Sequence, residues 1–222
     1  MLHKTRGVVF RFTRYGETSI IVNIFTEMFG LQSYIVNGVR SASARNKIAL
    51  YQPLTLLELI VYHRPNANIN RIKEARCLHP YQTITSDVRK SAIALFLNEL
   101  LNKTVKDESH AADLCTFMIN SFVMLDAIDR NAENFHLLFM IRLSRLLGFG
   151  AFNVNEVLGA RVVDQETEHL LEEMLNGGYD KPLIISNAKR REILDLLIKF
   201  YADHTGTLGD LRSLLVLREV LS

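Results

Sequence analysis

The sequence predicts an α+β protein in which a five-stranded antiparallel β-barrel precedes an all-α helical domain. The spacing of apolar residues changes near residue 80, from the alternation typical of strands to the recurrence at three and four typical of helices. Net charge changes there too: residues 1–80 hold three Lys, eight Arg and four Glu, giving +7, whereas residues 81–222 carry −5. Strands followed by helices indicate an α+β fold or two domains. We expect two, residues 1–80 and 81–222.

Five segments of the first domain are rich in the β-branched and aromatic residues that strands favour. Turn-forming sequences separate them, among them Arg14-Tyr15-Gly16, the polar segment from Ser41 to Lys47, and Arg64-Pro65-Asn66. Five short strands favour a closed barrel, because closure removes exposed strand edges. The predicted strands are residues 6–13, 17–27, 31–39, 53–63 and 69–78.

Six segments of the second domain have helical length and an apolar stripe at helical spacing. Asn176-Gly177-Gly178 ends one of them, and Asp180-Lys181-Pro182 turns the chain toward the next. The predicted helices are residues 88–105, 111–128, 134–147, 166–175, 188–204 and 208–221.

The composition is that of an ordinary globular protein, with 222 residues of which 48% are hydrophobic. The N-terminus has no apolar stretch like that of a signal peptide, and the longest apolar run is interrupted by Arg142 and Arg145. The only cysteines, Cys77 and Cys115, form no Cys-x-x-Cys pair, and we expect both to be small buried side chains. These features predict a cytoplasmic protein with no membrane segment.

Sequence signatures of enzymes are absent: there is no His-Glu-x-x-His, no Gly-x-Ser-x-Gly and no complete dinucleotide loop. Cys77 and His79, with His63 upstream, could form half of a metal site, but a structural zinc needs four ligands. We therefore expect no catalytic residue, no cofactor and no metal. A hydrolase that uses His63, His79 and nearby acids with an acquired metal is the least favoured alternative.

The most informative feature is a run without acids, because no Asp or Glu occurs between Glu27 and Glu58. Lys and Arg bind phosphates and aromatic rings stack on bases, so cations interleaved with aromatics predict a nucleic-acid-binding face. For any one residue, ordinary solvent exposure is an equally good explanation. The predicted binding residues are Arg6, Arg11, Arg14, Tyr15, Tyr34, Arg40, Arg45 and Lys47, with Phe12 and Tyr51 among the interleaved aromatics.

Two basic groups lie in the helical domain. Arg142 and Arg145 are the only charges on an otherwise apolar helix, so they either reach an anionic partner at its edge or form an internal ion pair. The run from Lys189 to Arg191 opens a helix, where an anion is favoured, although simple solvent exposure is the preferred explanation. We assign Arg142 and Arg145 to partner binding.

Several short motifs resemble the RecO family of bacterial recombination mediators, and their order and spacing cover nearly the whole chain. In the first domain they are Gly7-Val8-Val9, Tyr15-Gly16-Glu17-Thr18-Ser19, Phe25-Thr26 with Gly30, Asn37-Gly38-Val39-Arg40-Ser41, and Leu50 with Gln52-Pro53-Leu54. In the second they are Phe139-Met140-Ile141-Arg142-Leu143, Leu146-Leu147-Gly148-Phe149 and the closing Leu211-Arg212-Ser213-Leu214-Leu215-Val216-Leu217.

The resemblance implies an OB-fold followed by a helical domain in a non-enzymatic, nucleoid-associated DNA repair protein. Such a protein would bind single- and double-stranded DNA, anneal complementary strands, contact the acidic C-terminal tail of the single-stranded DNA-binding protein SSB, and with RecR help RecA onto SSB-coated DNA. Many relatives carry a four-cysteine zinc site in the helical domain. Residues 150–180 contain no cysteine here, so we expect no zinc and make no structural prediction for residues 150–165. The alternative is an OB-fold scaffold for RNA or a protein partner.

Overall fold

The fold is described by a computed structural model for residues 1–39, 45–65, 67–106, 110–179, 183–206 and 208–222. Of residues 45 and 46, only the backbone is described. The chain forms two compact units. The first comprises residues 1–82 and 105–123, and the second comprises residues 83–104 and 124–222. The boundary between the two compact units therefore passes through the helical region, whereas the predicted domains meet after residue 80.

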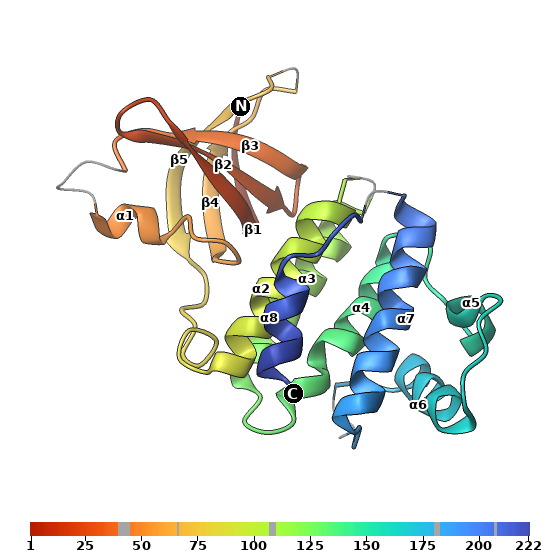
Figure 1. The fold of residues 1–222 in the computed structure, drawn as a ribbon. Coiled ribbons are helices and arrows are strands. Elements are labelled where there is room, and N and C mark those ends of the chain that lie inside the picture. Colours follow the sequence, from red (N-terminus) through yellow and green to blue (C-terminus); the bar gives the residue numbers. More distant parts are fainter. Residues whose placement is uncertain (40–44, 66, 107–109, 180–182, 207) are drawn as a thin grey trace. The chain divides into compact units, whose positions relative to one another are not determined.

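The first unit contains a closed five-stranded barrel with the strand order β1-β2-β3-β5-β4 (Figure 1). Neighbouring strands are antiparallel, except that β3 and β5 pair in parallel where the barrel closes. The predicted barrel is thereby confirmed. The strands are β1 (Leu2–Tyr15), β2 (Ser19–Thr26), β3 (Gly30–Val36), β4 (Leu56–Tyr62) and β5 (Asn70–Cys77).

The long first strand pairs with two neighbours. Its residues from Leu2 to Val8 pair with β4, and its residues from Gly7 to Tyr15 pair with β2. The register with β2 shifts between Val9 and Arg11, which marks a bulge that bends the strand. Gly7 lies where both pairings overlap, and a Cβ there would lie 2.7 Å from Ile24 Cγ2.

Buried side chains from all strands except β5 fill the barrel. Val39 and Tyr51, which lie outside the strands, belong to the same core. Tyr34 is among the largest fully buried side chains. Alternation along β2 explains the pattern: Ile20, Val22 and Ile24 point inward and are 0% exposed.

The prediction of a turn at residues 41–47 is wrong in part. Residues 45–49 form a short helix, α1 (Arg45–Ala49), while residues 40–44 lie outside the described part of the chain. The turn after α1 brings Tyr51 into the barrel core, where it is 5% exposed. Burial of this ring explains why so short a helix is stable here.

All six predicted helices are present, and one further helix, α5, lies in the segment for which no prediction was made. A short 3-10 helix, η2 (Ala132–Asn134), precedes α4. The α-helices are α2 (Val88–Thr104), α3 (Ala111–Ala127), α4 (Phe135–Leu146), α5 (Val154–Leu158), α6 (Gln165–Asn176), α7 (Asn187–Thr205) and α8 (Ser213–Val220).

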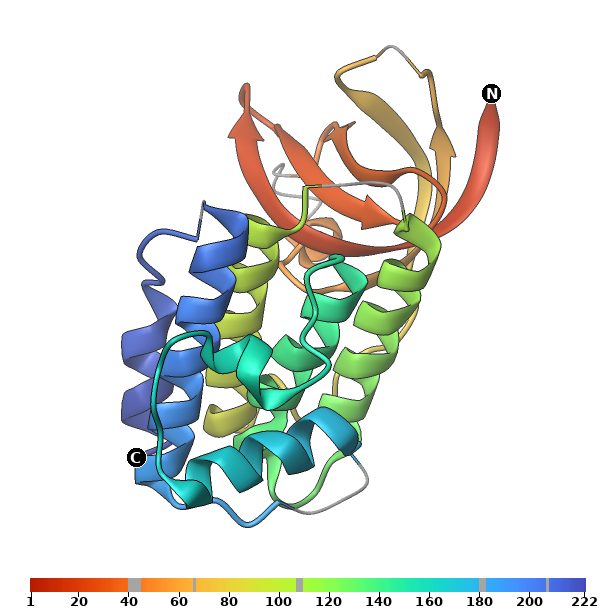
Figure 2. The same ribbon diagram turned by 90° about the vertical axis from the view of Figure 1, so that its right-hand side faces the viewer.

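Within the second unit, α4 lies between α2 and α7, and α8 packs on α2 (Figures 1 and 2). Nine of the twelve residues of α4 are buried, as its nearly all-apolar sequence predicts. In the described part of the chain, no helix is long and apolar enough to cross a membrane.

We expect Gly7→Ala to lower the free energy of unfolding by about 1–3 kcal/mol, because the new methyl group would overlap Ile24 Cγ2 at 2.7 Å and Phe25 O at 3.0 Å. Urea unfolding measures the change. The control is Thr13→Ala, an exposed position on the same strand, with an expected change within about 0.5 kcal/mol. Equal stability of the Gly7 variant and the parent would contradict this account of β1.

Candidate nucleic-acid interface

The outer surface of β1, β2, β3 and β5, which we call the barrel face, carries the candidate site. In the register of the sheet, Thr13 lies opposite Ile21, Ile21 opposite Ile35, and Ile35 opposite Arg71. Exposed Arg11 lies two residues before Thr13 on the same face of β1, opposite Asn23. Strands are about 4.8 Å apart, so β1 and β5 are separated by roughly 14 Å around the barrel. The barrel face thus has cations on both sides.

The middle of the barrel face is uncharged. Asn23 Nδ2 donates a hydrogen bond of 3.0 Å to Ser33 Oγ on the next strand. Ile21 and Ile35 in the neighbouring row are half-buried. Cations beside an uncharged, partly apolar strip suit a single strand of nucleic acid, whose backbone is charged and whose bases are not.

Arg64 and Arg71 were not among the residues predicted from the sequence. Arg71 is exposed on β5 opposite Tyr62 of β4, and exposed Arg64 lies just beyond β4. The turn signal at Arg64-Pro65 and the alternation along the β5 sequence were available as indications of exposure. Neither showed that Arg71 lies beside β3, which depends on the parallel pairing of β3 and β5.

Three of the four glutamates of the barrel lie beside cations other than these arginines. Glu27 pairs with Arg6, with the nearest oxygen and nitrogen 2.5 Å apart. Glu58 and Glu74 line a small hollow of about 150 Å³ together with Lys4 and Arg76. The fourth glutamate, Glu17, is exposed in the β1–β2 turn. Among the described residues, four exposed arginines of the barrel form no ion pair: Arg11, Arg14, Arg64 and Arg71.

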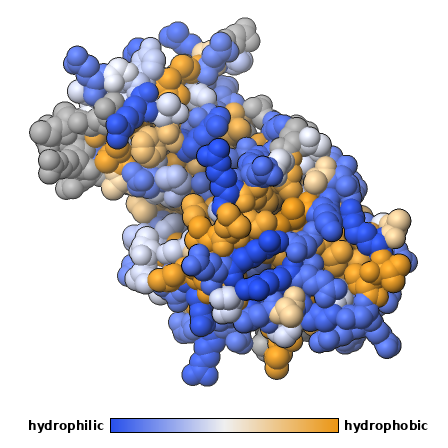
Figure 3. Space-filling model, viewed as in Figure 1, coloured by the Kyte–Doolittle hydropathy of each residue, from blue (hydrophilic) through white to orange (hydrophobic). Residues whose placement is uncertain are grey.

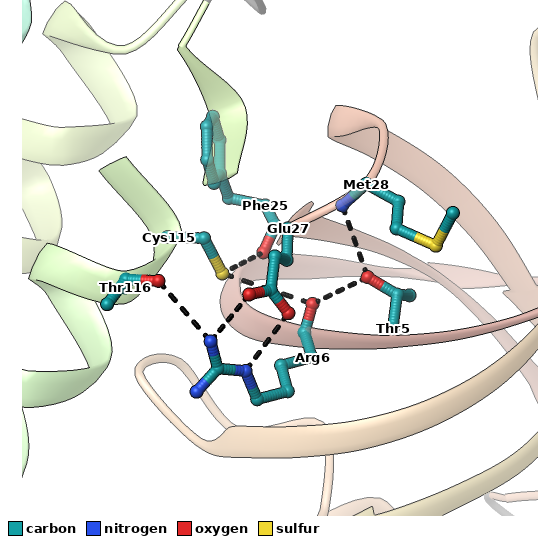
Figure 4. A network of polar contacts seen from close by, with 7 residues as sticks. All are labelled: Thr5, Arg6, Phe25, Glu27, Met28, Cys115 and Thr116. Atoms are coloured by element: carbon teal, nitrogen blue, oxygen red, sulfur yellow. Dashed lines mark hydrogen bonds and ion pairs between the residues drawn. The ribbon is translucent and has the colours of Figure 1, made fainter. Parts of the chain in front are cut away.

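Arg6, a predicted phosphate-binding residue, is instead held by an acid (Figure 4). Its Nε donates to Glu27 Oε2 at 3.0 Å and its Nη2 to Glu27 Oε1 at 2.5 Å. Nη2 also donates to Thr116 Oγ1 of α3 at 3.3 Å. A two-bond pair of this kind is strong and directional, so less of the Arg6 charge is left for a phosphate.

The contact between Arg6 and Glu27 shifts the pKa of both groups. The hydrogen bond from Arg6 holds the pKa of Glu27 below its usual value of 4.5 and raises that of Arg6. The neighbouring Cys115 thiol lies 3.9 Å from the carbonyl oxygens of Arg6 and Phe25. Burial raises the Cys115 pKa to about 12, so the thiol stays protonated and acts as a packed side chain.

The remaining predicted barrel residues divide into three groups. Arg14 and Tyr15 are exposed at the β1–β2 turn, and Lys47 is exposed on α1. The prediction that Tyr34 contacts nucleic acid is wrong. Tyr34 is 0% exposed in the barrel core, so its ring cannot stack on a base. Arg40 lies outside the described residues, and so does the side chain of Arg45.

In the helical unit, neither predicted partner-binding arginine forms an internal ion pair among the described residues. The Arg142 guanidinium lies 4.2 Å from the centre of the Tyr179 ring. Arg145 donates to Leu175 O at 2.8 Å and lies 5.9 Å from the Phe152 ring. Phe152 is 77% exposed, and Figure 3 shows hydrophobic side chains at the right-hand edge over α5 and the segment before it.

The run from Lys189 to Arg191 lies in the first turns of α7, which begins after the N-cap residue Ser186. Lys189 pairs with Asp164 and, at 3.1 Å, with Glu192. Arg190 is 8% exposed and donates to Asn134 Oδ1 at 2.8 Å. The side chains of Lys189 and Arg190 are therefore bound within the protein. Neither forms an open anion site, and neither is freely exposed to solvent.

Two family models match the chain, one over the barrel and one over part of the helical region. Residues 1–81 match the family model described as Recombination protein O N terminal, and residues 85–152 match the one described as Recombination protein O C terminal. The DNA repair protein RecO of Phocaeicola vulgatus is 33% identical over the full length of both chains. The chain belongs to the RecO family. Relatives of the same name in Bacteroides fragilis and Flavobacterium johnsoniae are 33% and 30% identical, each over 99% of both chains.

RecO membership assigns the chain a role in DNA repair and recombination, and its barrel is the OB-fold of that family. The described residues contain no group of three or more His, Cys, Asp or Glu arranged to hold a metal ion. The expected absence of the family's zinc site stays a prediction. The prediction that Cys77 is buried is wrong, because this side chain is exposed at the end of β5.

We expect Glu27→Gln to lower the free energy of unfolding by about 1 kcal/mol at neutral pH, because the charged half of the Arg6 pair is lost. The pKa of Glu27 is depressed in the folded state, so the pair stabilises the protein above pH 4.5 and is lost as pH falls through the lower folded value. Urea unfolding at neutral and acidic pH should therefore show a difference from the parent that shrinks in acid. A difference independent of pH would contradict this assignment.

Proposed function

We propose that the barrel face binds DNA without reading its sequence, and that the protein anneals complementary strands and, with RecR, helps RecA onto SSB-coated DNA. The observation that carries this proposal is the segregation of charge on the barrel. Arg11 and Arg71 flank an uncharged strip and form no ion pair among the described residues, whereas Glu58 and Glu74 gather with other cations. Cations without local acids attract a polyanion.

Affinity on such a surface comes from phosphate neutralisation, which releases condensed counterions. Contacts to phosphate position a strand but carry no sequence information. A strand held with its charge partly neutralised repels a second strand less, and this raises the rate at which complementary bases meet. No bond is made or broken in this process, so the proposed activity is non-enzymatic.

A second part of the proposal concerns the helical unit, where the acidic C-terminal tail of SSB would bind beside α4. Arg142 and Arg145 lie on this helix, and exposed Phe152 lies close to Arg145. A guanidinium can pair with a carboxylate, and an exposed aromatic ring can pack on an apolar side chain. An acidic peptide with an aromatic end meets both requirements.

The combined Arg11→Ala, Arg71→Ala variant is expected to bind a short oligothymidylate more weakly than the parent. The slope of log affinity against log salt should become shallower by about 0.7 for each lost phosphate contact. Fluorescence anisotropy across a salt titration measures both quantities, and a strand-annealing assay should show slower annealing.

The matched control is Arg76→Ala, since Arg76 is an exposed arginine of β5 that lies 4.0 Å from Glu74. It should keep the parent's salt slope. If the double variant and the parent have equal slopes and anneal DNA equally fast, the barrel face is not the DNA-binding surface.

For the helical unit, Phe152→Ala and Arg142→Ala are each expected to weaken binding of an acidic peptide that ends in phenylalanine by about tenfold, or roughly 1.4 kcal/mol. Isothermal titration calorimetry measures the affinity. The control is Arg89→Ala, because Arg89 is an exposed arginine paired with Glu133 at 2.6 Å. Unchanged affinity in both test variants would exclude this site.

A further inference from the structure

A cavity of about 680 Å³ opens on the barrel where the turn between β4 and β5 meets the sheet. Tyr62 at the end of β4, Arg64 and Ile69 in the turn, and Arg71 of β5 line it. Its volume is in the range of sites that hold a small ligand. The described lining residues include two arginines and no aspartate or glutamate, so the cavity suits an anionic ligand.

Hydrogen bonds within the turn fix the shape of the rim. Asn70 is 3% exposed, and its Oδ1 accepts a bond of 3.0 Å from the Arg64 amide. The Ala67 amide donates to Arg64 O at 3.1 Å, which closes the turn from within. At the base of the turn, the His63 ring stacks on Phe29 with ring centres 3.8 Å apart. The described residues of the rim are thus held in place before a ligand arrives, which reduces the entropy lost on binding.

The lining combines an aromatic ring with a neighbouring cation. Tyr62 is 47% exposed and is the cross-strand partner of Arg71, so their Cβ atoms lie about 5 Å apart. Ile69, which is 44% exposed, adds an apolar side chain to the same cavity. A ring for stacking, an apolar wall and two guanidinium groups match one nucleotide, whose base is flat and apolar and whose phosphate is anionic.

We propose that this cavity holds one unpaired nucleotide of a DNA single strand, with the base stacked on Tyr62 and the phosphates bound by Arg64 and Arg71. The inference rests on the proposed DNA binding by the barrel and adds a subsite for a base. A paired base must leave its stack to enter such a cavity, and this costs a few kcal/mol. The cavity therefore makes the barrel prefer single strands to duplexes, while neighbouring bases of the bound strand stay free to pair.

The test compares Tyr62→Ala and Tyr62→Phe with the parent, using a short oligothymidylate and an abasic strand of equal length. Tyr62→Ala should bind the oligothymidylate about tenfold more weakly, because one stacking contact is lost. Tyr62→Phe keeps the ring and should bind like the parent. On the abasic strand, which offers no base, all three proteins should bind equally. Leu215→Ala, which removes an exposed apolar side chain from the other unit, is the control and should bind both strands like the parent.

Equal binding of the oligothymidylate by Tyr62→Ala and the parent would overturn the inference. An equal loss on both strands would overturn it too, because Tyr62 would then act without contacting a base. Either result leaves the proposed DNA binding intact if the Arg11 and Arg71 variant still shows its shallower salt slope. If the parent binds neither strand in a salt-dependent way, the proposed function itself fails.

Discussion

Closure of the barrel depends on β1, which is hydrogen-bonded to two strands at once. Fourteen residues allow β4 to pair along its first part and β2 along its second, with Gly7 and Val8 shared. The bulge after Val9 turns the strand from one partner toward the other, and Val9 bonds to residues preceding β4, Thr55 and Leu54, at 3.0 and 2.7 Å. Because closure leaves few free strand edges, a polyanion that approaches the barrel face meets side chains, and their charges determine what binds.

Hydrophobic periodicity was enough to predict the fold class and the type of nearly every long element, because each buries one face. It could not reveal α1 and α5, which have five residues each and show less than two turns of any pattern. One local signal for α5 was present. Asn153 Oδ1 accepts a bond of 3.1 Å from the Glu156 amide, and the Glu156 carboxylate accepts from the Phe152 amide in return. This reciprocal arrangement resembles a capping box, and Asn-x-x-Glu is its sequence signature.

The candidate site was only partly predictable, for two physical reasons. Apolar residues occur on both faces of β3, so the sequence alone did not show that Tyr34 points inward; its pairing with Val22 does. Arg71 and Glu74 are close in sequence, so a count along the chain shows no excess charge there. The fold separates them, because Arg71 pairs with Tyr62 at one end of β4 while Glu74 lies in a hollow with Glu58.

Loops in each unit are held by side chains whose polar atoms bind backbone amides. In the barrel, Asn70 closes the turn between β4 and β5. In the helical unit, Asp126 Oδ1 accepts from the amides of Thr83 and Ile84 at 2.8 and 3.0 Å. Glu99 accepts hydrogen bonds from the Ser213 hydroxyl and from the amides of Arg212 and Ser213 at the start of α8. Burial would raise the Glu99 pKa, but these bonds lower it. Carboxylate-to-amide bonds are stronger than bonds between neutral groups, so these segments are ordered by the fold itself. Surfaces built on such loops are presented preformed, and less binding energy is spent on ordering them when a partner arrives.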